Sequence, residues 1–188
     1  MKELEEYLNK LLNFTENEMQ VILSFFAEKK LKKNEYFATE GEYSKYFAFI
    51  ISGVMRAFYR NIEGDEYNKT FFTNSSFVGA YSSLVTGQEN LINIQCLTDC
   101  LLLKANFKRI TKLYDSIPKI ERLSRIIAEQ FFVRKEKREI ELVMLEASDR
   151  YEIFKKEHTG LENLIPQYQI ASYLGVTPTQ LSRIRAKK

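Results

Sequence analysis

The sequence has few of the residues that hold metals or cross-links, with one histidine and two cysteines among 188 residues. A zinc or iron–sulfur site needs more ligands, and His158 lies in a charged stretch far from Cys96 and Cys100. Apolar and alternating residues flank the two cysteines, which predicts one strand across both, and four strand residues span roughly 13 Å. A disulfide does not reach that far. We therefore expect no metal, no cofactor and no cross-link.

Long apolar runs are also absent. The chain opens with charged residues in place of the apolar core of a signal peptide, and it contains no run of about 18 apolar residues. We expect a cytoplasmic protein with no membrane partner. Its 45% of hydrophobic residues suffices for the core of one or two domains. A net charge of +3 is too small for a protein that coats polyanions, so any contact with nucleic acid should be local.

The most informative stretch lies near the C-terminus. Ile170 and Leu174 are spaced so that they give a short helix one apolar face. Gly175 follows where a helix commonly ends through a positive φ. Thr177 and Pro178 then suit the N-cap and the first turn of a second helix. This succession predicts a helix-turn-helix.

The second helix of this motif directs Leu181 and Ile184 inward and leaves polar side chains outside. Such side chains can bond to base edges or to phosphate. The predicted DNA-contacting residues are Gln169, Thr177, Thr179, Gln180, Ser182, Arg183, Arg185 and Lys187.

Charge is concentrated in the same stretch. Residues 163–188 contain four basic residues and no acidic one, whereas residues 1–162 have a net charge of −1. The positive surplus therefore sits where attraction to phosphate would be useful. The simpler alternative is a solvated C-terminal helix that carries its charge by chance.

The first part of the chain predicts two short helices followed by strands. Leucines recur on one helical face from Leu4, and residues 15–18 fit a capping box before a second helix over 19–26. From 31 to 104 aromatic and β-branched runs alternate with turn signals, which predicts an antiparallel sandwich or barrel. Residues 46–59 are expected to form paired strands that turn at Gly53, with their aromatic rings in the core.

A long helix is predicted from Pro118, because neither glycine nor proline recurs before Gly160. Apolar residues repeat every seven positions, and others form further rows, so more than one face must be buried. The repeat comprises Ile126, Val133, Ile140, Ala147 and Phe154. We expect a parallel homodimer through residues 117–145, although intruding charges leave a core helix of a single chain as the alternative. Ser148 can cap a new start, which predicts a hinge there.

These elements, in this order, resemble the Crp/Fnr family of bacterial transcription regulators, whose sensory domain resembles a cyclic-nucleotide-binding domain. The resemblance covers nearly the whole chain, is most specific over 170–185, and is weaker at 77–79 and 49–54. It implies an α+β fold with an antiparallel, jelly-roll-like β-roll and flanking helices. The expected division is a sensory domain at 1–115, a dimerisation helix at 116–147 and a small all-α helix-turn-helix domain at 148–188.

Two details of the helix-turn-helix depart from that family. By the resemblance, Thr179 and Arg183 face bases, whereas Pro178 occupies a base-reading position that is often polar or charged in the family. No residues for the family's β-hairpin wing follow Lys188 in this sequence. We therefore expect a helix-turn-helix without a full wing and a target sequence of its own.

The effector pocket departs further from the family. Members that bind cyclic AMP carry Gly-Glu and, later, Arg-Ser or Arg-Thr, and here these positions read Gly79-Ala80 and Asn90-Leu91. The ribose acceptor and the phosphate partner are both missing, so cyclic AMP is an unlikely effector. The pocket implied by the resemblance comprises Gly79, Ala80, Tyr81, Ser82, Asn90, Leu91, Lys135 and Glu136. It could take another effector or be filled by the protein's own side chains.

The sequence therefore predicts a dimeric regulator rather than an enzyme. Its two recognition helices would enter successive major grooves, roughly 34 Å apart, on a near-palindromic operator. One alternative is a ligand-binding or scaffold protein whose helix-turn-helix does not bind DNA. A cupin-like enzyme would need several metal-binding histidines, and the chain has one.

Overall fold

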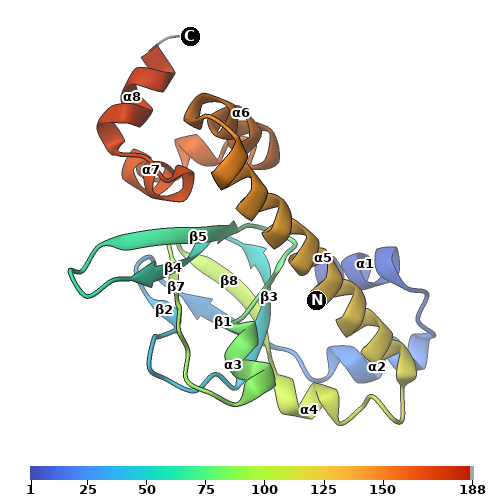
Figure 1. Cartoon of the computed structure of the whole chain (residues 1–188). Helices are drawn as coiled ribbons and strands as arrows, with labels where there is room; N and C mark the ends of the chain where they lie inside the picture. Colours follow the sequence, from blue (N-terminus) through green and yellow to red (C-terminus); the bar gives the residue numbers. More distant parts are fainter. Residues whose placement is uncertain (187–188) are drawn as a thin grey trace. The chain divides into compact units, whose positions relative to one another are not determined.

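Two four-stranded sheets occupy residues 27–106 of the computed structural model, which describes residues 1–186 (Figure 1). The first sheet has the order β1 (Ala27–Leu31), β8 (Cys100–Asn106), β3 (Tyr46–Ser52) and β6 (Phe77–Val78). The second has the order β2 (Tyr36–Ala38), β7 (Asn93–Cys96), β4 (Met55–Arg60) and β5 (Glu66–Phe72). The pairs β1–β8, β3–β8, β3–β6 and β2–β7 are antiparallel. The predicted α+β fold with an antiparallel β-roll is confirmed.

The described chain divides into two compact units. Unit 1 consists of Met1–Ala57 and Phe71–Ala128. Unit 2 consists of Phe58–Thr70 together with the described residues from Glu129 onward. The hairpin between β4 and β5 thus belongs with the C-terminal helices, and α5 contributes to both units. The expected division at residues 115 and 147 concerns functional segments and stays a prediction.

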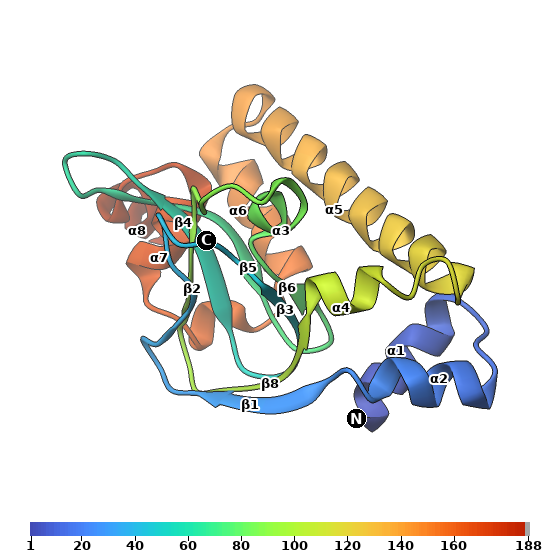
Figure 2. The ribbon, with the colours of Figure 1, turned by 90° about the horizontal axis from the view of Figure 1, so that it is seen from below.

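Helices α1 (Lys2–Leu11) and α2 (Glu16–Leu23) precede the strands of unit 1 (Figure 2). The predicted capping box is confirmed, because Thr15 N donates to Glu18 Oε2 at 2.7 Å and Glu18 N donates to Thr15 Oγ1 at 3.3 Å. Leu4 and Leu8 are buried on the inner face of α1. Two short helices, α3 (Tyr81–Thr86) and α4 (Phe107–Thr111), complete the unit before α5.

Aromatic side chains fill part of the core of unit 1, as the sequence predicted. The rings of Phe49 and Phe77 have centroids 5.2 Å apart, and Tyr7 of α1 lies 5.2 Å from Phe49. The predicted pairing of β3 with β4 is wrong, because the two strands belong to different sheets. The turn at Gly53 carries the chain from one sheet to the other.

The two cysteines lie on different strands, so the predicted single strand across them is wrong. Cys96 ends β7, Cys100 starts β8, and residues 97–99 turn the chain between them. Both thiols are free and buried. The two thiols share a hydrogen bond, which holds the pKa of Cys96 well above its usual value. Within residues 1–186, no group of three or more His, Cys, Asp or Glu side chains is arranged to hold a metal ion.

Gly53 is the position where the fold depends most directly on a missing side chain. Its φ is +109°, and an added Cβ would lie 2.5 Å from the carbonyl oxygen of Asp99 and 2.6 Å from Cys100 Sγ. Gly53→Ala should therefore lower the free energy of unfolding by about 3 kcal/mol through backbone strain and overpacking. Gly64 is the matched control, because its φ is +90° but nothing lies within 4 Å of the added Cβ.

Urea denaturation followed by circular dichroism would measure both variants. Gly64→Ala should cost only about 1 kcal/mol, from the positive φ alone. Equal losses for the two glycines would contradict the steric role of Gly53.

The long helix α5 (Pro118–Met144) begins with Pro118 in its first turn, as predicted. It ends before the expected hinge, and α6 (Ala147–Glu157) follows with Glu146 as its N-cap. The prediction that Ser148 caps a new helix is therefore wrong. Phe154 lies on α6, so the seven-residue repeat does not run along one helix. No helix among residues 1–186 has the length and apolar character required to span a bilayer.

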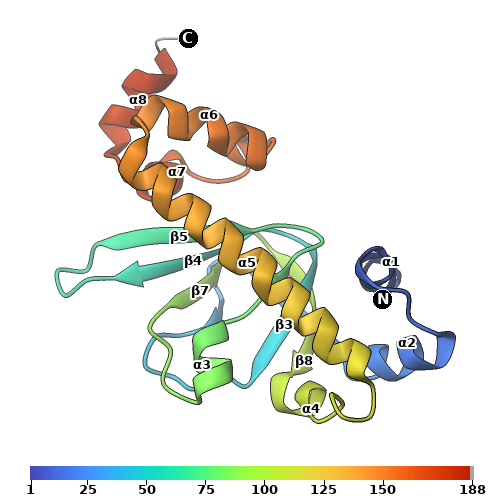
Figure 3. The same cartoon turned by 45° about the vertical axis from the view of Figure 1, so that its right-hand side comes forward.

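Besides the hairpin Phe58–Thr70, unit 2 contains the C-terminal half of α5 and the helices after it (Figure 3). After α6, a 3₁₀ turn at Leu161–Asn163 leads to α7 (Gln167–Leu174) and α8 (Pro178–Ala186). Its core comprises Tyr151, Phe154, Leu161, Ile165, Ile170, Ala171, Tyr173, Leu174 and Leu181, all buried.

Candidate nucleic-acid interface

The two last helices form the predicted helix-turn-helix. Gly175 ends α7 with a φ of 69°, and α8 begins at Pro178. Thr177 is the N-cap residue, since its Oγ1 accepts from Gln180 N at 3.2 Å while its own N donates to Gln180 Oε1 at 2.9 Å. This reciprocal capping box satisfies backbone donors that would otherwise lack partners. The turn and the start of the second helix are thus fixed by local chemistry.

The outward face of α8 carries much of the predicted DNA-contacting set. Thr179, Ser182, Arg183 and Arg185 are exposed, while Leu181 points into the core with 1% exposure. Thr177 and Gln180 are exposed as well, but their side chains are used in the capping box. Arg185 also interacts with the Tyr151 hydroxyl. Lys187, the remaining basic member of the set, lies outside the described residues.

Gln169 is placed differently from the prediction. Its side chain is 3% exposed, and its Oε1 accepts from Asn68 Nδ2 at 2.7 Å. The structure therefore puts Gln169 inside unit 2 rather than on a surface that can meet DNA. No local pattern indicates this placement, because the bonding partner lies about a hundred residues earlier in the chain.

Two arginines hold the C-terminal end of α7. The guanidinium of Arg138 on α5 donates to the carbonyl of Tyr173 and lies 4.1 Å from the centroid of the Tyr173 ring. Arg150 on α6 donates through Nε to the carbonyl of Leu174 at 3.1 Å. Carbonyls at the end of a helix lack partners within it, and charge-assisted donors satisfy them well. These contacts fix α7, and with it the recognition helix, against α5 and α6.

His158 packs beside the same end of α7. Its ring lies 5.2 Å from Phe154 and 5.9 Å from Tyr173. Burial lowers the pKa of His158 below its ordinary value of 6.5; Arg138 and Arg134 act in the same direction and Glu157 opposes them. The single histidine is therefore a packing residue of the helix-turn-helix unit.

This environment predicts a pH dependence of stability. Below pH 6.5 the unfolded chain binds a proton at His158 more readily than the folded chain does, so acidification should destabilise the fold. The melting temperature should fall between about pH 7.5 and about pH 5.5. His158→Phe should show a smaller fall over the same range, and an identical fall in both proteins would contradict a role for this histidine.

The second half of α5 presents an apolar stripe to solvent. Phe132, Val133, Ile140, Val143 and Met144 are between 56% and 82% exposed. Beside the stripe lies a hollow of about 410 Å³, lined by Val133, Glu136, Lys137, Ile140, Glu141, Leu145 and Ile153. Exposed apolar side chains in this number along one helix are typical of a surface that another protein covers.

In unit 1, the segment after β6 leads through Gly79 and Ala80 into α3 and then to Asn90. Asn90 is 3% exposed, and its side-chain amide donates to Thr39 O at 2.9 Å and accepts from Ser44 Oγ at 2.9 Å. The backbone of Asn90 also bonds to Gly41 and Glu42. This asparagine therefore fastens the segment to the loop between β2 and β3.

One segment of the chain matches a known family model. Residues 28–116 match the family model described as "Cyclic nucleotide-binding domain". This segment is similar to that family. A sequence search of curated proteins gives no match.

Solved structures share the fold over most of the chain. FixK2 from Bradyrhizobium japonicum is similar with a TM-score of 0.76 at 15% identity, over 86% of this chain and 83% of that chain. A CooA mutant from Carboxydothermus hydrogenoformans has a TM-score of 0.71 at 18% identity, over 96% and 83%. A protein from Eubacterium rectale titled as a regulator of the crp/fnr family gives 0.73 at 15% identity, over 97% and 87%. The chain thus has the fold of these structures.

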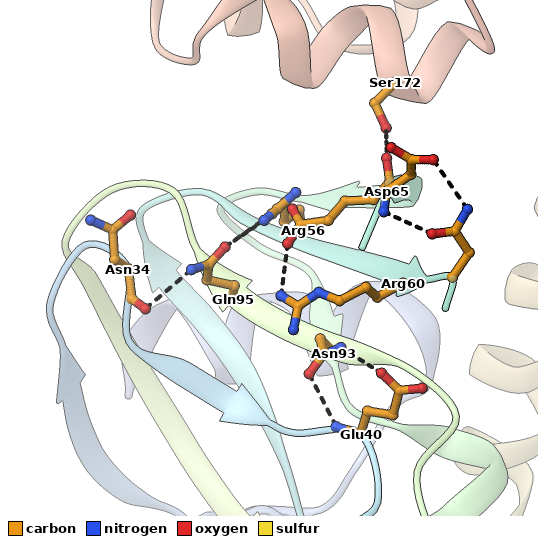
Figure 4. Close-up of polar contacts among 10 residues, drawn as sticks. Asn34, Glu40, Arg56, Arg60, Asp65, Asn93, Gln95 and Ser172 are labelled. Carbon is orange, nitrogen blue, oxygen red and sulfur yellow. Dashed lines mark hydrogen bonds and ion pairs between the residues drawn. The ribbon is translucent and has the colours of Figure 1, made fainter. Parts of the chain in front are cut away.

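Within residues 28–116, polar side chains bond to one another (Figure 4). Arg56, which is 4% exposed, donates to Gln95 Oε1 from Nη2 at 2.7 Å, and Gln95 donates to Asn34 O at 3.2 Å. The buried Asn93 accepts from Glu40 N at 3.0 Å and donates to Glu40 Oε2 at 3.3 Å. Polar groups inside the domain are thus partnered within the chain.

The eight residues of the predicted effector pocket differ in exposure, and the pocket stays a prediction. Ala80 and Asn90 are buried, Gly79 is half-buried, and Tyr81, Ser82 and Leu91 are exposed, Leu91 to 75%. Lys135 and Glu136 belong to unit 2 and are exposed.

Residues of this segment line a hollow of about 210 Å³. It lies between α3, α4 and the loop before β3, and its lining includes Ser44, Ser83, Leu84 and Phe107. None of the eight predicted residues lines it.

Proposed function

We propose that the protein is a dimeric, DNA-binding transcription regulator of the Crp/Fnr type that works in the cytoplasm and is not an enzyme. The observation that carries this proposal is the outer face of α8. Thr179, Ser182 and Arg183 are exposed together on a helix whose start is fixed by a capping box and whose inner face is buried. A rigid helix with such a face can lie in a major groove.

The chemistry of this face suits base recognition. Hydroxyl groups of Thr179 and Ser182 can donate to or accept from base edges, and Arg183 can donate two parallel bonds to a guanine. Arg185 lies two residues after Arg183 on α8 and can reach phosphate. The net charge of +4 over residues 163–188 supports a local contact with DNA.

The stripe on α5 supports the homodimer through residues 117–145. A second copy that places its own stripe against Val133, Ile140 and Met144 would remove these side chains from water. A twofold pair presents two recognition helices, and these suit half-sites one helical turn apart on a near-palindromic operator.

The effector, in this proposal, is not cyclic AMP. Ala80 has no acceptor for a ribose hydroxyl, and the polar atoms of Asn90 are taken by Thr39 and Ser44. The buried polar side chains of this segment, which bond to one another, favour the alternative in which the protein's own residues fill the effector pocket. A different small molecule would have to displace these bonds or use another site.

Selection from random-sequence duplexes tests the proposal. The protein should enrich a near-palindromic sequence. Its affinity should fall steeply as salt is raised, because binding gains free energy by releasing counterions from the DNA and added salt reduces this gain. Addition of cyclic AMP should leave that affinity unchanged. Failure to retain any duplex at low salt would instead favour the scaffold alternative, and a response to cyclic AMP would overturn the argument from Ala80 and Asn90.

A further inference from the structure

The hairpin Phe58–Thr70 is an ordered part of unit 2. Its turn is closed by Asp65 N donating to Asn61 Oδ1 at 2.8 Å and Asn61 N donating to Asp65 O at 3.0 Å. An ion pair of 2.8 Å between Arg60 and Glu66 joins the two strands beside this turn. These bonds stabilise the hairpin internally. Its contacts with other segments are therefore made by an ordered structure.

Strand β5 of this hairpin is hydrogen-bonded to α7, the first helix of the helix-turn-helix. Asn68 Nδ2 donates to Gln169 O at 2.8 Å and to Gln169 Oε1 at 2.7 Å. Asn68 N donates to Ser172 Oγ at 3.0 Å, and that hydroxyl donates to Glu66 O at 2.7 Å. Figure 4 shows Ser172 reaching from its helix to the hairpin. Four hydrogen bonds therefore join two segments about a hundred residues apart.

The contact is both buried and specific. Asn68 is 7% exposed and Gln169 is 3% exposed. Buried amides need partners of the right geometry, and here each amide uses the other. Separating the hairpin from α7 would return these groups to water, which can replace the lost hydrogen bonds, so the two states can be close in free energy. Such a small difference suits a reversible contact.

The contact also conflicts with DNA binding by α7. The first helix of a helix-turn-helix crosses the DNA backbone. Here the hairpin occupies the face of α7 that carries Gln169 and Ser172, so neither side chain is available to a phosphate. The hairpin also contains three acidic residues, Glu63, Asp65 and Glu66, against two basic ones, which gives it a net negative charge that repels phosphate.

We propose that the hairpin is an autoinhibitory latch, in which Asn68 grips α7 and holds the helix-turn-helix in a state of low affinity for DNA. The latch, which rests on the proposed function, leaves Thr179, Ser182 and Arg183 exposed. It acts by holding α7 and by placing negative charge beside it, not by covering the recognition helix.

The latch also gives the sensory domain a route to the DNA-binding helices. Phe58 and Thr70 are bonded directly to Ala57 and Phe71, which are strand residues of unit 1 on β4 and β5. A ligand that displaced these strands would move the hairpin with them. The ligand could change the affinity for DNA by no more than the ratio of its own affinities for the released and latched states.

Release of the latch is tested by Asn68→Ala, with Ile62→Ala as the matched control because Ile62 is 99% exposed on the same hairpin. Affinity is measured by fluorescence anisotropy on a duplex selected from random sequences by the Asn68→Ala variant. We expect Asn68→Ala to bind about tenfold more tightly than the wild type, and Ile62→Ala to bind as the wild type does. Thermal melts of each protein establish that it is folded.

Closure of the latch is tested by the double variant Asn68→Cys with Ser172→Cys, compared with each single variant. Oxidation should lower the affinity of the double variant about tenfold, and a reductant should restore it. This arm tests the proposal even if Asn68→Ala fails to fold.

The outcomes separate the latch from the proposed function. Equal affinities of the wild type, the released variant and the locked variant would overturn the latch alone. Weaker binding by Asn68→Ala would overturn autoinhibition and make the hairpin a support of the DNA-bound form. No binding by any of the proteins would overturn the proposed function and the latch with it.

Discussion

Replacing Ile140 and Val143 by aspartate is expected to convert the protein into a monomer and to lower its affinity for its operator on the order of 100-fold or more. Ile140 is 56% exposed and Val143 is 82% exposed on the stripe of α5. In the proposed dimer both would face the partner, and carboxylates buried there without partners would be strongly unfavourable. A monomer binds only one half-site, so it loses the additional binding free energy that a dimer obtains from the second half-site.

Analytical ultracentrifugation would report the mass of this double variant, and anisotropy its affinity for DNA. Arg134→Asp is the matched control, because it also lowers the net charge by two and lies outside the stripe. The control should stay dimeric and lose much less affinity. A double variant that remains dimeric would show that the copies meet through another surface.

Arg183→Ala should weaken binding to the preferred operator by about 1 to 3 kcal/mol, which is about 5-fold to 150-fold. The reason is the loss of a bidentate contact to a base by an exposed arginine of the recognition helix. Lys112→Ala, which removes the same charge from unit 1, is the control and should bind almost as the wild type does. The dimer should stay intact in both variants.

Binding of Arg183→Ala to scrambled duplexes distinguishes two roles for this residue. Little change on scrambled sequences, with a large loss on the operator, would assign Arg183 to base reading. An equal loss on all sequences would make Arg183 a phosphate clamp.

The helix-turn-helix was readable from the sequence because its signals are local. The end of α7 requires a positive φ, which Gly175 adopts readily. The next helix starts within three residues, at Thr177 and Pro178. The structure adds Gln180 as the reciprocal partner of the cap. Each of these effects acts between residues a few positions apart, where sequence patterns are most informative.

Pairings between distant segments could not be read in the same way. The run 46–59 has the composition of a hairpin, yet Gly53 passes the chain to the other sheet, where β4 pairs instead with β7 and β5. Cys96 and Cys100 are close in sequence, but a turn places them on separate strands. The alternation of apolar and polar residues along a strand indicates which face is buried. It does not indicate which other strand will pair with it.

The burial of Gln169 illustrates the same limit at the candidate site. A polar side chain on a short helix is expected to face outward. Gln169 is buried because it bonds to Asn68 of the hairpin, and no local sequence pattern around Asn68 indicates this pairing. The arginines at the end of α7 were missed for a similar reason. Arg138 breaks the apolar pattern of α5, and its partner is the backbone carbonyl of Tyr173. Every residue has a backbone carbonyl, so the sequence does not indicate which one accepts this bond.

The central claim is that a twofold pair of these chains places two α8 helices in successive major grooves. Hydroxyl-radical and methylation-interference footprinting of the wild-type protein on its selected duplex tests this directly. We predict two symmetric sets of major-groove contacts whose centres lie about 10 base pairs apart. A single asymmetric contact region, or protection confined to the minor groove, would contradict it.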